Sequence, residues 1–169
     1  MRRNHLKTTV NAALLAALFI ICVSFVRLPT AFGFIHFADV FLFLAAYFLP
    51  LPAACLTCAV GGALGDIMAG YAVYAPATVA IKILMILLIN RGKKPLSERN
   101  ILALLYGLVI NVGGYYIFNS FLYEGALADG FSAALASVPT DAIQSVVSAV
   151  LFVIVATAAE KFNFGSEKR

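Results

Sequence analysis

Charged side chains are scarce in this chain of 169 residues. They make up 12% of the sequence, whereas 63% of the residues are hydrophobic and the mean hydropathy is +0.97. A water-soluble domain of this size would have to expose a largely apolar surface to water. The composition therefore excludes a soluble globular protein and indicates a membrane protein.

Alternation of polar and apolar residues is also lacking, which argues against a transmembrane β-barrel. The apolar segments are continuous runs, so the expected fold is all-α: a single polytopic helical membrane domain over residues 1–169. The sequence contains no convincing repeat and no linker. The first apolar run, 6–26, has no gathered cleavage-site residues, and we expect it to remain as the first helix rather than to be a signal peptide.

Hydropathy predicts six membrane spans, and proline, glycine or charged residues separate them. The longest connection contains the segment GFSAALAS, for which we expect a short interfacial helix. The predicted spans are 6–26, 35–50, 53–72, 76–90, 100–122 and 139–160.

The distribution of basic residues predicts the orientation. Six spans place both termini on one side, together with the connections near 51–52 and 91–99. That side holds ten of the twelve basic residues, so both termini are expected in the cytoplasm of a bacterial cell. These ten are Arg2, Arg3, Lys7, Arg91, Lys93, Lys94, Arg99, Lys161, Lys168 and Arg169. The net charge of +4 then reflects topology and contact with anionic lipid, not nucleic-acid binding.

Residues for metal binding or catalysis are few. Cys55 and Cys58 form a C-x-x-C pair, but no second Cys/His pair accompanies it, so we interpret both as small packing residues. The sequence has no G-x-S-x-G, no H-E-x-x-H and no nucleophile–base arrangement. We therefore expect neither an enzyme nor a metal or cofactor bound by this chain.

Two ionisable residues, Asp66 and Lys82, lie inside predicted spans on either side of the loop Tyr71–Ala75. Each is about 10 Å below that turn if the flanking segments are helical. Charges at such depth are costly unless they are paired or face a polar cavity. The two residues either pair with each other as a structural lock or mark a binding site, and one does not exclude the other.

Other polar residues recur at helical spacing and map to the same outer half of the membrane, with Asn111 nearer the midplane. Asn111, Tyr115 and Asn119 are four residues apart, and Asp141 and Gln144 share a face of the last span. This coincidence predicts an outward-opening pocket for a flat polar heteroaromatic ligand of pyrimidine, pyridine, flavin or deazapurine type. The predicted substrate-binding residues are His36, Asp39, Asp66, Tyr71, Tyr74, Lys82, Asn111, Tyr115, Asn119, Asp141 and Gln144.

Each of these residues also has a structural interpretation. Asp141 can be a first-turn acid favoured by the helix dipole, and the outer tyrosines can form an interfacial belt. Asn111 and Asn119 can be interhelical hydrogen-bond partners, and His36 can be a simple interfacial histidine.

The cytoplasmic half lacks a polar track to the inner face, which a self-sufficient transporter would need. The pattern is therefore typical of a subunit that captures a molecule from outside and depends on other subunits to release it inside. In the first span, Ala12 and Ala16, and likewise Ala13 and Ala17, form small-xxx-small pairs to which another helix can pack closely. They either bind a partner or pack against this chain's own helices.

Nearly the whole chain resembles the substrate-binding S components of energy-coupling factor (ECF) vitamin transporters. The resemblance rests on size, six spans, the alanine pairs and three segments: GFIHFADVFLFLAAYFLP, GGALGDIMAGYAVYAPATVAIKILM and VPTDAIQ. The middle segment is most similar to the subgroup of riboflavin-, hydroxymethylpyrimidine- and pyridoxine-type S components. Asp141 is a departure, because some riboflavin-type relatives have asparagine there.

The resemblance implies capture of a vitamin from outside and association with a transmembrane coupling protein and two cytoplasmic ATPases. Ala12, Ala13, Ala16 and Ala17 would contact the coupling protein, and the loops 27–37 and 71–75 would act as lids. ATP would be used by the partner subunits, which agrees with the lack of a G-x-x-x-x-G-K-[ST] loop here.

A membrane scaffold of cell-envelope machinery is the alternative function. Such proteins can have similar length and span number, but they need no acid and base beside an outer polar pocket. An intramembrane enzyme ranks below both.

Overall fold

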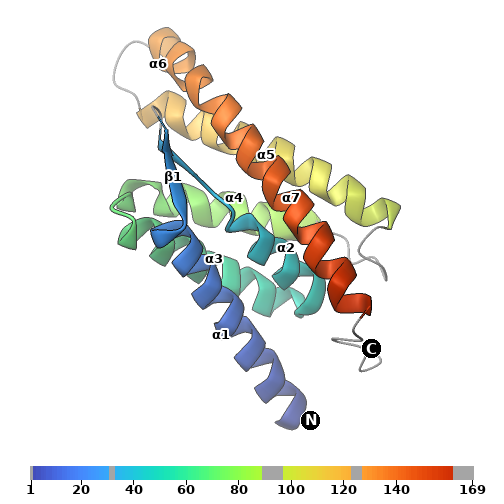
Figure 1. The fold of residues 1–169 in the computed structure, drawn as a ribbon. Helices are drawn as coiled ribbons and strands as arrows, with labels where there is room; N and C mark the ends of the chain where they lie inside the picture. The colour runs from blue at the N-terminus through green and yellow to red at the C-terminus, as the bar shows by residue number, and fades with distance from the viewer. Residues whose placement is uncertain (1, 31–32, 89–96, 123–126, 162–169) are drawn as a thin grey trace.

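The computed structural model describes residues 2–30, 33–88, 97–122 and 127–161 of the chain (Figure 1). The described part consists of helices and one small antiparallel hairpin. The order is α1 (Arg2–Phe25), β1 (Arg27–Thr30), β2 (Gly33–His36), α2 (Asp39–Phe48), α3 (Leu51–Met68), η1 (Ala72–Tyr74), α4 (Ala75–Leu88), α5 (Glu98–Leu122), α6 (Leu127–Ala134), η2 (Leu135–Ser137) and α7 (Val138–Lys161).

Four of the helical segments are long and apolar enough to cross a membrane: His5–Phe25, Leu51–Met68, Glu98–Leu122 and Gly130–Ala159. The other two predicted spans correspond to shorter apolar helices, Asp39–Phe48 and Ala72–Leu87. The all-α class is thus confirmed, and six spans remain a prediction. The last two residues of the predicted span 76–90 lie outside the described residues, as do Arg91, Lys93, Lys94, Lys168 and Arg169.

Helix α2 lies at the centre of the fold. It contacts α1, α3, α4 and α7, and most of its residues are buried. Ten helical residues extend only about 15 Å, half of the ~30 Å hydrocarbon core of a bilayer. The helix within the predicted span 35–50 is therefore shorter than expected and is preceded by a strand, because the residues up to His36 pair with β1 instead of continuing the helix.

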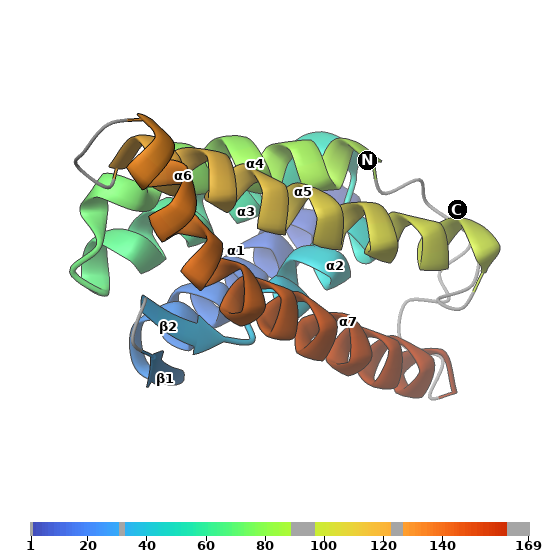
Figure 2. The same ribbon diagram turned by 90° about the horizontal axis from the view of Figure 1, so that it is seen from above.

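The hairpin was not predicted from sequence. Its register pairs Arg27 with His36 and Thr30 with Gly33. Figure 2 shows the hairpin beside the first turns of α7, where β2 contacts that helix. The predicted short helix at GFSAALAS is present, as the end of α6 and η2.

Glycines allow the helices to approach closely. A Cβ on Gly65 of α3 would lie 2.9 Å from Cβ of Val23 in α1. Three residues earlier in α3, a Cβ on Gly62 would lie 2.8 Å from Cγ2 of Thr78 in α4. Small residues at such crossings bring backbones together where lipid offers no hydrophobic driving force. Gly62 lies four residues before Asp66, so its crossing with α4 is on the same face of α3 as that acid.

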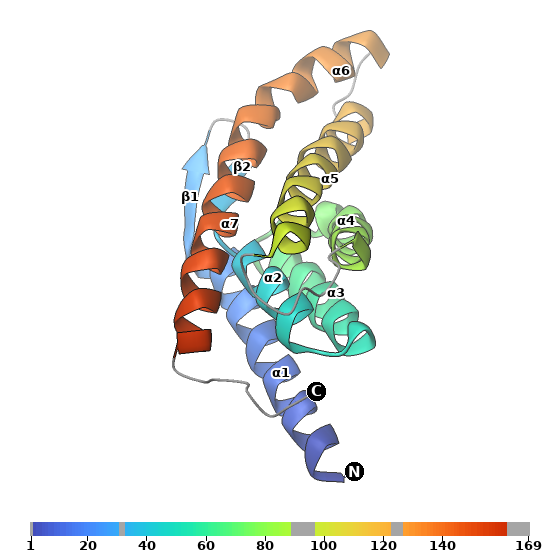
Figure 3. The same cartoon turned by 90° about the vertical axis from the view of Figure 1, so that its right-hand side faces the viewer.

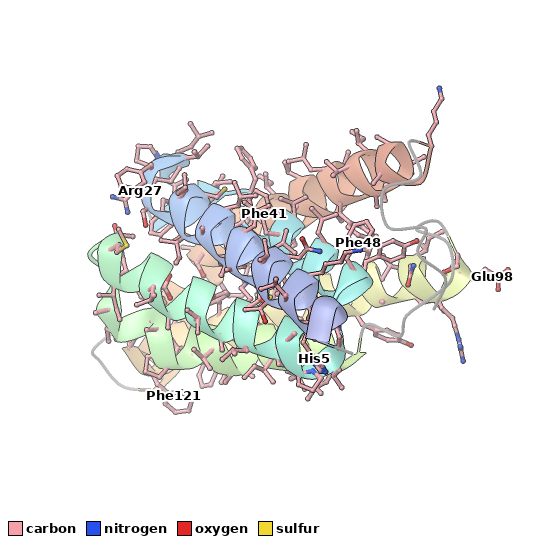
Figure 4. All side chains as sticks on the ribbon, turned by 90° about the horizontal axis from the view of Figure 1, so that it is seen from below. His5, Arg27, Phe41, Phe48, Glu98 and Phe121 are labelled. Atoms are coloured by element: carbon pink, nitrogen blue, oxygen red, sulfur yellow. The ribbon has the colours of Figure 1, made fainter. Side chains whose placement is uncertain are left out.

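The first residues of α1 and the last of α7 lie at the same end of the molecule (Figures 1 and 3). Arg27 and Phe121 lie at one end, and Glu98 lies at the other (Figure 4).

Candidate functional site

A pocket opens between the hairpin, the turn around η1, and helices α3, α4, α5 and α7. It encloses about 550 Å³ of empty space when its open mouth is included. The lining residues are Phe34, His36, Asp66, Tyr71, Tyr74, Thr78, Tyr115, Asn119, Ser137, Asp141 and Gln144.

Eight of the eleven predicted site residues line this pocket: His36, Asp66, Tyr71, Tyr74, Tyr115, Asn119, Asp141 and Gln144. They come from five separate parts of the chain, which the fold brings together around one pocket. The other three, Asp39, Lys82 and Asn111, are buried and do not line it.

Lys82 pairs with Asp39, not with Asp66. Its Nζ lies 2.7 Å from Oδ1 of Asp39, and the two side chains are 1% and 0% exposed. The proposed Asp66–Lys82 lock is therefore wrong, because central helix α2 brings Asp39 to the lysine. The same ammonium lies 5.4 Å from the centre of the Tyr115 ring. The ion pair joins α2 to α4 and lies behind the pocket.

Asn111 completes this buried network. Its Oδ1 accepts a hydrogen bond from Lys82 Nζ at 2.7 Å, and its Nδ2 donates to Ser145 Oγ at 3.0 Å. The Ser145 hydroxyl in turn donates to the main-chain oxygen of Asp141 at 2.8 Å. The oxygen and the nitrogen of the Asn111 amide are thus both hydrogen-bonded within the protein. This agrees with the interpretation of Asn111 as an interhelical hydrogen-bond partner.

Asp66 faces the pocket through a chain of hydroxyl groups. The Thr78 side chain hydrogen-bonds to the Asp66 carboxylate, and the Thr78 and Tyr115 hydroxyl oxygens are 2.8 Å apart. If Thr78 donates its one proton to the carboxylate, Tyr115 must donate to Thr78. These hydrogen bonds hold the Tyr115 side chain in the pocket wall. They leave the second oxygen of Asp66, Oδ2, without a partner among the described residues.

A second polar group lies where α5 meets the start of α7. Asn119 Nδ2 donates to Ser137 Oγ at 3.0 Å, and the Ser137 hydroxyl donates to the Ala134 carbonyl at 3.0 Å. Asn119 Oδ1 and Asp141 Oδ2 are buried, and neither has a partner among the described residues. Both residues line the pocket.

His36 ends the hairpin and is neutral. Its main-chain N–H donates to Gln144 Oε1 at 3.2 Å, and its Nδ1 accepts from the Ala38 N–H at 3.2 Å. An accepting Nδ1 places the ring proton on Nε2. His36 lines the pocket, so its neutral imidazole offers an N–H donor there.

Aromatic contacts connect the hairpin to the turn at the pocket mouth. The Phe34 and Tyr71 ring centres are 4.9 Å apart in an edge arrangement. Arg27 lies 5.0 Å from the centre of the Phe34 ring and donates to the Ala69 carbonyl at 3.0 Å. The two loops expected to act as lids are therefore in contact with each other.

Three lining residues were not predicted: Phe34, Thr78 and Ser137. Thr78 lies four residues before Lys82, so its helical face could have identified it. Ser137 precedes the last helix, where a cap is a common interpretation. No feature of the sequence indicated that Phe34 lines the pocket, because the hairpin that brings it there was not predicted.

The alanine pairs on α1 divide between two surroundings. Ala12 packs against the core, and its main-chain oxygen accepts from the Thr57 hydroxyl at 3.5 Å. Ala13 and Ala17 are exposed, and Ala16 is half-buried. Ala12 thus packs against other helices of this chain, while Ala13 and Ala17 form an exposed surface that another helix can contact.

The described residues contain no group of three His, Cys, Asp or Glu side chains placed to hold a metal ion. Cys22, Cys55 and Cys58 are free thiols.

Comparison with known proteins identifies one family. Residues 3–161 match the family model described as ECF-type riboflavin transporter, S component. No curated protein matches the chain.

Proposed function

This chain belongs to the family of ECF-type riboflavin transporter S components, and we propose that it captures a small heteroaromatic vitamin, or a precursor of one, from outside a bacterial cell. The family consists of substrate-binding subunits of transporters, so the chain is a transport subunit rather than an enzyme. Import would require a transmembrane coupling protein and two cytoplasmic ATPases, which would use the ATP.

The observation that carries this proposal is the pocket itself. It is polar on its walls, aromatic at its mouth and built from the ends of several helices. Such a combination of flat aromatic faces and a few convergent polar groups is typical of sites for small heteroaromatic ligands. The eight predicted residues that line it would contact the ligand, and Asp39, Lys82 and Asn111 would hold the helices behind it.

The proposed topology has six membrane-crossing segments with both termini in the cytoplasm. Four helices are long enough to cross unaided, and α2 and α4 would complete the bundle within it. The pocket would then open toward the outside of the cytoplasmic membrane. The shared end of α1 and α7 in Figures 1 and 3 supports this arrangement.

The proposed coupling surface is the exposed edge of α1 at Ala13 and Ala17. Small side chains there would let a helix of the coupling protein approach closely. The half-buried Ala16 would lie at the margin of this surface, and Ala12 would support it from inside.

Two measurements on the affinity-tagged chain test the proposal. Mass spectrometry of the purified protein should detect a bound heteroaromatic molecule. When the partner subunits are co-expressed, they should co-purify with the chain. Ala13→Leu adds bulk to the proposed surface, so it should abolish co-purification of the partners and keep the bound molecule.

Leu14→Phe is the matched control. It adds bulk at an exposed position (57%) about a quarter-turn around the same helix, and it should retain the partners. Undiminished co-purification of the partners with Ala13→Leu would refute the coupling surface. A chain that carries no small molecule and binds no partner would refute the proposed function.

A further inference from the structure

We propose that the pocket selects a ligand with a protonated amine or a comparable cationic N–H group, which binds between Asp66 and Asp141. This inference rests on the proposed function, since it names the chemical class of molecule that the capture site takes. It differs from the flavin that the family's description names, because the ring of a flavin is neutral and rich in carbonyl acceptors.

The first support is Asp66. It is 7% exposed and lines the pocket, and Thr78 hydrogen-bonds to its carboxylate. Its Oδ2 has no partner among the described residues. A buried carboxylate oxygen without a donor is unfavourable, so a ligand that supplies an N–H there removes the penalty.

The second support is Asn119, which is 4% exposed. The one hydroxyl proton of Ser137 goes to the Ala134 carbonyl, so Ser137 can only accept from Asn119. This fixes the amide with its nitrogen toward Ser137 and leaves Oδ1 as a free acceptor at the pocket. Asp141 adds a third unpartnered oxygen, Oδ2, in the same lining. Three acceptor oxygens of the lining thus have no donor among the described residues, beside the donor that His36 Nε2 offers.

The third support is the charge balance. None of the eleven lining residues in the described part of the chain is lysine or arginine, while two are aspartates. Lys82 is already bound by Asp39 and Asn111, and Arg27 donates to the Ala69 carbonyl. A cation that comes with the ligand would balance the charge of these two carboxylates.

The aromatic walls agree with this inference. Phe34, Tyr71, Tyr74 and Tyr115 present ring faces and edges to the pocket. A protonated heteroaromatic gains from aromatic faces through cation–π attraction, in addition to stacking. A carbonyl-rich neutral ring would instead bring acceptors against Asp66, Asp141 and Asn119.

The test compares probes that differ only in an amine and a hydroxyl group. Pyridoxamine is paired with pyridoxine, and 4-amino-5-aminomethyl-2-methylpyrimidine with its 5-hydroxymethyl counterpart; riboflavin is added as the neutral flavin. Titration calorimetry on the purified full chain at pH 7 should give at least about tenfold tighter binding for the amine of at least one pair, because charge-assisted hydrogen bonds are the stronger ones.

Substitutions of the two pocket aspartates test whether the preference for the amine arises in the pocket. Asp66→Asn and, separately, Asp141→Asn should each reduce affinity for the preferred amine about tenfold and change affinity for its hydroxyl partner much less. Glu98→Gln removes an exposed acid at the opposite end of the molecule and should leave both affinities unchanged. Two separate aspartate variants keep the test decisive if one of them fails to fold.

The inference is overturned if riboflavin or the hydroxyl members bind as tightly as the amines, or if no amine binds. It is also overturned if the preference for the amine survives in both aspartate variants. Partner co-purification and mass spectrometry of the bound molecule do not depend on these probes. The proposed function would therefore stand if those two measurements succeeded and only the amine preference failed.

Discussion

Lys82 illustrates what can be inferred at the scale of single residues. Its position inside an apolar segment already indicated that it must be paired or face a polar cavity. Its partner could not be inferred, because Asp39 is 43 positions away (82 − 39) and was expected at the outer end of another span. The choice between Asp39 and Asp66 depends on the position of α2 in the centre of the bundle.

Replacing Lys82 should destabilise the protein, because it leaves the buried Asp39 carboxylate without its ion-pair partner. Lys82→Met would leave Asp39 buried and unpaired, at a cost of about 3–5 kcal/mol in the free energy of unfolding. Adding Asp39→Asn to that variant removes the stranded charge and should restore part of the loss. Denaturant unfolding in detergent, followed by circular dichroism, measures both effects.

Lys161→Met removes an exposed lysine in the last turn of α7 and should change stability little. Equal unfolding free energies for the Lys82→Met single variant and the double variant would show that the ion pair does not hold α2 to α4.

At the scale of elements, the helices were predictable and the hairpin was not. The segments near α1, α3, α4, α5 and α7 were identified within a few residues, because long continuous apolar runs are a strong signal. The helix in the run 35–50 is shorter than predicted, because the first residues of that run belong to β2. The β1–β2 hairpin has only four residues in each strand and carried no turn signal strong enough to predict it.

The neighbouring glycines of α5 provide a test of helix packing. A Cβ on Gly114 would lie 2.7 Å from Cγ1 of Ile81 in α4, whereas a Cβ on Gly113 would meet nothing within 4 Å. Gly114→Ala should therefore separate α4 from α5 and destabilise the protein by about 1–3 kcal/mol. Gly113→Ala should be neutral or stabilising by up to about 1 kcal/mol, because alanine favours the helix.

The two variants differ by one position, so their melting temperatures in detergent can be compared directly. A Gly114→Ala protein as stable as Gly113→Ala would mean that α4 and α5 do not approach as closely as described.

At the scale of the whole molecule, composition and spacing predicted the fold class and the meeting of the polar stripes. Eight of the eleven predicted residues line one pocket. The sequence could not show which of these residues line the pocket and which are buried behind it. Asn111, Tyr115 and Asn119 recur at one helical spacing, yet Asn111 is used entirely by Lys82 and Ser145, whereas Asn119 keeps a free oxygen.

The proposed orientation can be tested with single cysteines. With Cys22, Cys55 and Cys58 changed to alanine, two exposed positions are each given a thiol: Leu28→Cys, beside Arg27 in β1, and Glu98→Cys. Arg27 and Glu98 lie at opposite ends of the molecule (Figure 4). A membrane-impermeant maleimide added to intact cells should label Leu28→Cys and leave Glu98→Cys unlabelled. Inside-out vesicles should give the reverse, and the opposite pattern would place the termini outside.

The contact between the hairpin and the turn has a consequence for residence time. Arg27 donates to the Ala69 carbonyl, and Phe34 packs against Tyr71, so an outward movement of either loop would break contacts with the other. We expect these contacts to narrow the open mouth and to slow the release of a bound molecule. Slow dissociation, more than fast capture, should then set the affinity of this chain for its ligand.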